Sequence, residues 1–378
     1  QFYLPNEVVK HFQSRFKTLT DSCQQWKSQI DSASQDNDFD VAWKCVHQTT
    51  YPELEYPTFD AGTKLATRKA FGATLDKFAD QIPNLIGGSA DLEPSNYTGN
   101  FATKFGDFSK TNRTGRNLAF GVREFPMAAA MNGIALHGGL IPFGGTFLVF
   151  ADYERPALRL GSIQKCRVMH EFTHDSFWVG EDGPTHQPIE HAMALRAIPN
   201  LNVYRPADAK ETAVCFKLAL ESHETPSALL LTRQGVPVLE SSIDATIDGV
   251  TKGAYSVFDC DSPELIFLAT GSEVSLAMEV AQQMNDKKIR VVSMPCWELF
   301  ESQSSDYKRS LIPTRGAMKI SFEAGVTLGW DRYIGSNGLA IGIDHFGASA
   351  PGADLAEEFG FTAPKVEAKI REHLGSLL

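Results

Sequence analysis

RVMHEF at residues 167–172, THDS at 173–176 and GEDGPTHQP at 180–188 stand close together and form the most informative part of the chain. The first segment predicts a strand. The other two are rich in Gly, Pro and ionisable residues, so they predict a loop at the carboxyl end of that strand. Open α/β sheets bind ligands at this end of their strands. The stretch therefore indicates an α/β domain with a functional loop over 173–188.

Strands and helices alternate on both sides of this loop. Phe71, Leu75, Phe78 and Ile82 have the spacing of one helix face, and a buried strand is predicted just after them at 85–88. Further strands are predicted at 140–143, 201–204 and 228–231, and helices at 124–137, 152–164, 188–197 and 208–222. This alternation predicts a mostly parallel sheet with helices on both faces.

A second alternating unit begins near residue 250, after a polar stretch over 236–250. It is expected to contain strands at 265–269, 289–294, 318–321 and 339–343, with a helix at 274–284. We therefore expect two consecutive three-layer α/β domains, at 63–240 and 241–378. Residues 1–62 are polar and contain Pro5, Pro52 and Pro57, so we interpret them as a connector with one short amphipathic helix and a loop over 31–40.

Composition excludes several classes of protein. The 378 residues are 43% hydrophobic and 21% charged, which is typical of a folded soluble chain. The net charge of −11 is unfavourable for binding nucleic acid or an anionic membrane through bulk charge. None of the 6 cysteines forms a C-x-x-C pair, so a zinc site or a disulfide framework is not expected. The most apolar run, 127–150, is interrupted by Asn, His, Pro and Gly and does not predict a membrane span.

Glu124 opens an almost wholly apolar helix in the sequence GVREFPM at 121–127. An acidic residue in a first helical turn is usually a surface charge that complements the helix dipole. Here the apolar helix is expected to be buried, so the carboxylate would be partly desolvated and would need a hydrogen-bond partner. Such a group is a candidate for handling a proton.

The loop over 173–188 contains two histidines and three acidic residues besides its Gly and Pro. These residues could bind a polar substrate, hold a metal ion or form a plain polar loop. No second cluster of oxygen ligands follows at a suitable spacing, which makes the metal reading the weakest of the three.

Candidate anion-binding and aromatic residues lie at other predicted element ends. Arg68 opens a helix, Ser95 lies in EPSN at 93–96, and Arg233 follows a strand. A single Arg in such a place is usually a solvated charge, but two at a sheet edge would suit bidentate binding of phosphate. Phe147, Phe150 and Tyr153 would form either a core stripe or an aromatic wall for a flat heterocycle.

Together these segments resemble the transketolases, which are thiamine-diphosphate enzymes. The resemblance covers roughly residues 60–375 and is most specific in the GEDGPTHQP string. The matching segments are 66–69, 87–92, 94–96, 121–124, 173–176, 180–188, 232–234 and 345–349.

The resemblance implies a role for each residue on the cofactor side of the site. Glu124 is similar to the family glutamate that hydrogen-bonds a ring nitrogen of the aminopyrimidine and assists deprotonation of the thiazolium carbon. The aromatic pocket around that ring would consist of Phe147, Phe150 and Tyr153. Asp91 resembles an aspartate near the same ring.

On the substrate side, the resemblance implies a clamp for sugar phosphates formed by Arg68, Ser95, His174 and Arg233. Asp182 resembles the residue that recognises a substrate hydroxyl. His186 resembles a catalytic histidine at the reacting carbon. The expected reaction is reversible transfer of a two-carbon ketol unit from a ketose phosphate to an aldose phosphate.

In the family, a diphosphate-binding domain precedes the pyrimidine-binding and C-terminal domains. This chain resembles the connector and the last two domains, and it lacks the Gly-Asp-Gly motif of the first. The ligands of Mg²⁺ or Ca²⁺ are therefore expected outside this chain, which should contact only the aminopyrimidine half of thiamine diphosphate, bind the cofactor weakly or not at all, and be inactive alone. A cytoplasmic homodimer with its active site between subunits is implied.

Two alternatives remain open from the sequence. Dihydroxyacetone synthase, a relative that uses formaldehyde, has the same motifs, although the apparent phosphate clamp favours sugar phosphates. The chain could instead be an inactive two-domain module, or a subunit that pairs with a separate diphosphate-binding chain as the β subunits of 2-oxoacid dehydrogenases do.

Overall fold

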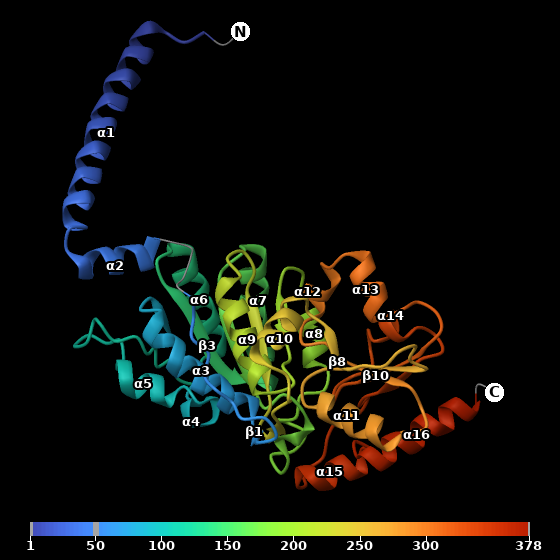
Figure 1. The fold of residues 1–378 in the computed structure, drawn as a ribbon. Coiled ribbons are helices and arrows are strands. Elements are labelled where there is room, and N and C mark those ends of the chain that lie inside the picture. Colours follow the sequence, from blue (N-terminus) through green and yellow to red (C-terminus); the bar gives the residue numbers. More distant parts are fainter. Residues whose placement is uncertain (1–2, 48–52, 377–378) are drawn as a thin grey trace. The chain divides into compact units, whose positions relative to one another are not determined.

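The computed structural model describes residues 3–47 and 53–376 (Figure 1). The chain divides into two compact units, residues 1–52 and residues 53–378, and each is described by itself.

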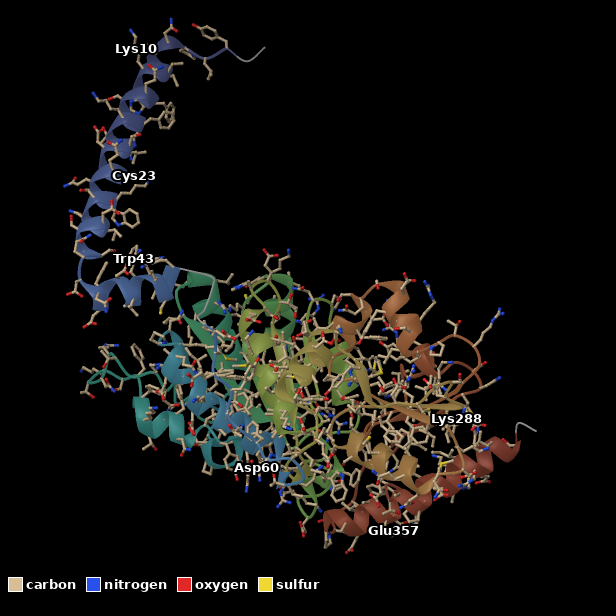
Figure 2. All side chains as sticks on the ribbon, in the orientation of Figure 1. Lys10, Cys23, Trp43, Asp60, Lys288 and Glu357 are labelled. Carbon is tan, nitrogen blue, oxygen red and sulfur yellow. The ribbon has the colours of Figure 1, made fainter. Side chains whose placement is uncertain are left out.

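The first unit contains two helices, α1 (Asn6–Ala33) and α2 (Asn37–His47), and neither helix buries a residue. The side chains along α1, such as that of Cys23, are exposed (Figure 2). A small aromatic cluster joins the two helices, with ring centroids 6.0 Å apart between Trp26 and Trp43. The prediction of one short helix was wrong, because no Gly or Pro interrupts 6–33 and α1 runs through this range, and the loop or turn expected over 31–40 is confined to the turn at 34–36.

The second unit begins with a segment that packs on a helix of the first sheet. Leu54 is buried, and Tyr56 lies edge-on to Phe78 with ring centroids 5.7 Å apart. Lys77 forms an ion pair with Glu55.

The first sheet has five parallel strands in the order β2-β3-β4-β6-β5. Its strands are β2 (Leu85–Ser89), β3 (Ile141–Phe147), β4 (Met169–Thr173), β5 (Asn202–Tyr204) and β6 (Ser227–Leu231). On one face, Met127 and Met131 of α6 (Glu124–His137) pack against Gly144 of β3, and α7 (Ala151–Ile163) lies beside α6 (Figure 1). The opposite face carries α3 (Thr67–Gln81) and α9 (Ala209–Glu221), joined by the stacked rings of Phe78 and Phe216.

The second sheet also has five strands, in the order β12-β11-β9-β10-β8. They are β8 (Tyr255–Phe258), β9 (Leu265–Ala269), β10 (Ile289–Ser293), β11 (Met318–Phe322) and β12 (Leu339–Ile341). Only β8 pairs antiparallel, at one edge. The prediction of two α/β units with mostly parallel sheets is therefore confirmed.

Helices cover both faces of the second sheet as well. On one face, α11 (Glu273–Gln283) and α16 (Ala363–Ser376) bury residues such as Val280 and Ile370 against Phe267. On the other, α12 (Trp297–Glu301) and α14 (Asp331–Ile334) contribute Trp297 and Tyr333. The remaining short elements are β1 (Lys64–Leu65), α4 (Glu93–Asn96), α5 (Gly99–Phe105), a 3-10 turn at Leu148–Phe150, a second at Phe177–Val179, α8 (His191–Arg196), β7 (Val236–Pro237), α10 (Ile243–Thr251), α13 (Ser305–Leu311) and α15 (Gly352–Glu358). Across residues 3–47 and 53–376, no helix combines the length and apolar character needed to span a membrane.

Candidate active site

Several of the predicted site residues gather around the carboxyl ends of β3 and β4. Phe147 is the last residue of β3, and His174 follows directly after β4. Because these strands are parallel neighbours, with Phe147 paired to Thr173, their ends lie side by side. This is the edge at which α/β sheets bind ligands.

Aromatic rings form one wall of this region. The rings of Phe147 and Phe150 are parallel within 1°, with centroids 5.7 Å apart, and Tyr153 lies 6.1 Å beyond Phe150. His186 meets the Phe150 ring edge-on at 5.7 Å, so the 180–188 loop touches this wall. Phe147 is buried, whereas Tyr153 is 66% exposed. The rings therefore lead from the core to a surface against which a flat heterocycle could pack.

His174 connects the aromatic wall to the cationic side of the site. Its ring stacks on Phe147 with centroids 3.8 Å apart, and its Nδ1 lies 2.8 Å from Oγ1 of Thr173. Burial, with added repulsion from Arg68, Arg233 and His186, lowers the pKa of His174 to about 3. The imidazole is therefore neutral at physiological pH, when one nitrogen can donate and the other accept a hydrogen bond.

Arg68 lies beside this histidine, with Nη1 3.4 Å from its Nε2. The same Nη1 donates to the backbone carbonyl of Ser95 at 2.9 Å, and the guanidinium lies over the ring of Tyr97. Burial lowers the pKa of Arg68, and the positive charge of Arg233 lowers it further. Within residues 53–376, neither Arg68 nor Arg233 forms an ion pair with a carboxylate. Two neighbouring guanidinium groups without a counter-ion favour an incoming anion.

Glu124 is the first residue of α6 and is 9% exposed, which agrees with the expectation of a partly desolvated carboxylate. The expected protein partner is missing: within residues 53–376, no hydrogen bond reaches the Glu124 carboxylate. The negative charge of Glu124 also helps to raise the pKa of the buried Glu154 on α7.

Sequence reasoning missed a buried pair formed by Glu154 and His170. Both side chains are inaccessible, and Oε1 of Glu154 lies 2.7 Å from Nδ1 of His170 on β4. Burial raises the pKa of the Glu154 carboxyl, His170 opposes the rise, and Glu124 adds to it. The signal in the sequence was the neighbouring polar residues His170 and Glu171 inside the strand predicted at 167–172. A fully buried strand rarely contains such residues.

Asp91 and Asp182 are not joined to this group by any contact within the described residues, and the exposed Arg233 acts on it only through its charge. Asp91 follows β2 with a left-handed φ of 65° and is exposed. Asp182 is also exposed, on the 180–188 loop. That loop is nevertheless fixed, because Nε2 of Gln187 donates to the carbonyls of Gly180 at 2.8 Å and Ala348 at 2.9 Å.

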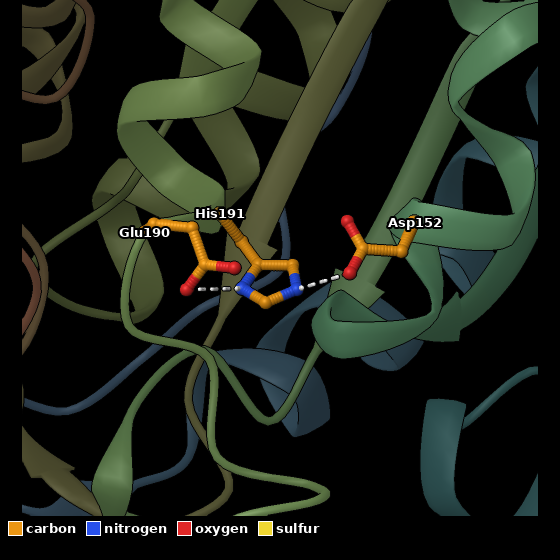
Figure 3. Close-up of side chains that lie close together, drawn as sticks. All are labelled: Asp152, Glu190 and His191. Carbon is orange, nitrogen blue, oxygen red and sulfur yellow. Dashed lines mark ion pairs between the residues drawn. The ribbon is translucent and has the colours of Figure 1, made fainter. Parts of the chain in front are cut away.

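Asp152, Glu190 and His191 form a separate cluster of possible metal ligands beside Tyr153 (Figure 3). The two carboxylates face opposite nitrogens of the buried imidazole, Asp152 at 3.3 Å from Nε2 and Glu190 at 3.8 Å from Nδ1. One ligand atom from each of the three residues lies within 4.8 Å of the others, and neither ring nitrogen of His191 has a hydrogen-bond partner within the described residues.

Comparison with known proteins assigns both α/β domains to one family. The family model described as "Transketolase, pyrimidine binding domain" matches residues 63–238, and the "Transketolase-like TK C-terminal domain" matches residues 253–362. A transketolase of Geobacillus stearothermophilus is 44% identical over 99% of this chain and 57% of its own length. The chain thus spans little more than half the length of such curated relatives.

Solved structures agree. The transketolase of Leishmania mexicana superposes with a TM-score of 0.89 at 40% identity, over 98% of this chain and 55% of that one. A Pichia stipitis transketolase in complex with sedoheptulose 7-phosphate gives a TM-score of 0.89 at 36% identity, over 99% of this chain and 56% of that one. The chain belongs to the transketolase family, and its two α/β domains are the pyrimidine-binding and C-terminal domains of that family.

Proposed function

We propose that this chain supplies the sugar-phosphate-binding and pyrimidine-binding half of a transketolase active site. The observation that carries the proposal is the contact series from Arg68 through His174 to Phe147. It connects an unneutralised cationic site to an aromatic wall. A ketose phosphate needs the first feature at its phosphate end, and a bound heterocycle needs the second.

On the substrate side, Arg68 and Arg233 bind the phosphate and the neutral His174 contributes a directed hydrogen bond. Fixing the phosphate holds the far end of the substrate, and this positions the reacting carbonyl. Ser95 contributes its backbone carbonyl to Arg68 and so orients the guanidinium. His186 at the Phe150 ring acts on the reacting end, and Asp182 accepts a hydrogen bond from a substrate hydroxyl.

On the cofactor side, the described residues fit the aminopyrimidine of thiamine diphosphate. The buried Glu124 carboxylate has no partner within residues 53–376, so it is free to bind a ring nitrogen, and Phe147, Phe150 and Tyr153 would surround the ring. Asp91 would lie near the same ring. When bound, thiamine diphosphate supplies the carbon that attacks the ketose carbonyl and stores the electrons of the broken bond.

The remaining elements of the proposal follow from family membership. We propose domain boundaries at residues 62 and 240, Mg²⁺ or Ca²⁺ bound by residues outside this chain, a homodimer and a cytoplasmic location. The transferase activity itself requires a diphosphate-binding domain in addition to this chain.

Calorimetric titration of the 378-residue chain with fructose 6-phosphate, and with fructose as the control, tests the substrate side. The phosphorylated ketose is expected to bind at least about tenfold more tightly, the effect of about 1.4 kcal/mol. Arg233→Ala should remove most of that difference without changing the affinity for fructose. Equal affinities of the wild-type chain for both sugars would contradict the clamp.

A further inference from the structure

Arg205 lies in a buried ionic network between the two α/β domains. It follows β5 and is 1% exposed. Its Nε donates to Oδ2 of Asp175 at 2.9 Å, in the loop after β4. Its Nη1 donates to the carbonyl of Thr270 at 2.8 Å and to the carboxylate of Glu273, both in the C-terminal domain. Arg205 therefore connects the loop that contains His174 to the start of α11.

The C-terminal domain builds its side of this network with several contacts. The hydroxyl of Ser272 donates to Glu273 at 2.7 Å, and the backbone N–H of Ala324 donates to the same carboxylate at 3.0 Å. Gly271 has a φ of 59°, and a Cβ there would lie 2.7 Å from Cζ of Arg205. A side chain at this position would displace the guanidinium, so the turn before α11 is shaped around Arg205.

Charge balance keeps the network together. Burial alone would lower the pKa of Arg205, but the carboxylates of Glu273, Asp175 and, more weakly, Glu323 more than offset this and raise it above its usual range. Asp175 is 1% exposed and has no other side-chain partner among the described residues. A buried carboxylate without a counter-ion is costly, so the side chain of Asp175 must remain at Arg205.

Asp175 in turn restricts His174, the residue before it. His174 has a left-handed φ of 63°, a conformation that a non-glycine residue adopts at a cost. The conformation lets Asp175 point to Arg205 while the ring of His174 stacks on Phe147 and faces Arg68. Tertiary contacts on both sides of this peptide therefore hold its backbone in place.

We propose that Arg205 and Glu273 are positioning residues that hold His174 in the phosphate site, so that the C-terminal domain sets the geometry of that site through Asp175. This role rests on the proposed function, because that function is what makes the site around His174 a phosphate site. The position of His174 can nevertheless be measured without catalysis.

A second ion pair between the same domains provides a matched control. Arg196 makes two hydrogen bonds of 2.8 Å to Glu323, and the two side chains are 2% and 4% exposed. Arg196 also lies over the ring of Trp297. It resembles Arg205 in burial and in the domains that it joins, and its partner Glu323 acts on Arg205 only through charge, but within the described residues no hydrogen bond or ion pair joins Arg196 to Asp175.

The experiment measures carbethoxylation of His174 by diethyl pyrocarbonate, followed peptide by peptide with mass spectrometry. The ring is buried, stacked and engaged at both nitrogens, so it should react slowly in the wild-type chain. In Glu273→Gln and Arg205→Lys, the rate at His174 is expected to rise at least about fivefold, because opening of the 173–176 segment becomes easier. The buried His170 should stay unreactive in the same samples, and Arg196→Met should leave His174 unchanged.

Each variant is compared well below its own melting temperature, after circular dichroism has shown that it is folded. A folded Glu273→Gln with a His174 rate within twofold of the wild type would overturn the proposal, as would an equal rise in Arg196→Met. Failure of the sugar-phosphate titration would contradict the proposed function instead, since the reactivity of His174 does not depend on that binding.

Discussion

Glu171→Gln should change how stability depends on pH. Glu171 is a central residue of β4, paired in register with Gly145 on one side and Leu229 on the other, and it is fully buried. Neither carboxyl oxygen has a hydrogen-bond partner within the described residues. Burial raises the pKa of this carboxyl well above its usual value, with Arg68 opposing. The folded protein should therefore keep Glu171 protonated at pH values where the unfolded chain has released that proton.

The sign and size follow from proton linkage. Because the folded state holds one more proton than the unfolded state, the stability that Glu171 provides is complete at low pH and falls as pH rises towards the folded-state pKa. One proton corresponds to about 1.36 kcal/mol per pH unit. Between pH 5.5 and 7.5 the wild type should lose up to about 2.7 kcal/mol from this residue. Gln is nearly isosteric and does not titrate, so the variant lacks this loss.

Urea unfolding of both proteins at pH 5.5, 6.5 and 7.5 measures the effect. The two chains share all other titrating groups. The contributions of those groups therefore cancel in the difference in unfolding free energy between variant and wild type. Relative to the wild type, Glu171→Gln should gain stability with each step in pH, at unchanged urea dependence. A difference that stays constant over this range would refute a protonated Glu171.

Two further substitutions test the packing around the site. Glu154→Leu leaves Nδ1 of His170 buried without its partner and should lower the free energy of unfolding by about 2–4 kcal/mol. Adding His170→Phe should recover most of that loss. Additive effects of the two substitutions in a double-mutant cycle of urea unfolding would argue against the pair. Gly145→Ala would place a Cβ 2.6 Å from Oε2 of Glu171 and 2.8 Å from Nδ2 of Asn96, so it should lower stability by about 1–3 kcal/mol; a melting temperature equal to the wild type would contradict this crowding.

The elements that could be predicted most precisely from sequence are those made of nearly continuous apolar residues. The helix expected at 124–137 and the strand expected at 265–269 have the same bounds in the structure. The start of α1 was predicted from the helical spacing of Val8, Phe12 and Phe16, but its continuation to Ala33 was missed because the helix buries no residue and its later part is mostly polar. The antiparallel strand β8 was missed because it lies at an edge and is only partly buried.

Prediction of the site was limited in a different way. The motifs identified the residues that the strand ends bring together, such as His174 and Phe147, because sheet topology places those ends side by side. Sequence spacing could not find the partner of Arg205, because Asp175 and Glu273 come from different domains and meet only through tertiary packing. It also could not show that Ser95 acts through its backbone carbonyl.

Glu124 is proposed to hydrogen-bond a ring nitrogen of the cofactor's aminopyrimidine, in the half of the active site that this chain supplies. The most direct test is a chimera in which this chain replaces the matching 57% of the Geobacillus stearothermophilus transketolase, assayed for ketol transfer with thiamine diphosphate and Mg²⁺. The wild-type chimera should transfer a two-carbon unit between sugar phosphates, and Glu124→Gln should reduce the rate at least about 100-fold, as expected for loss of a group that assists proton transfer, without changing the fold. A Glu124→Gln chimera that retains the wild-type rate would contradict the account.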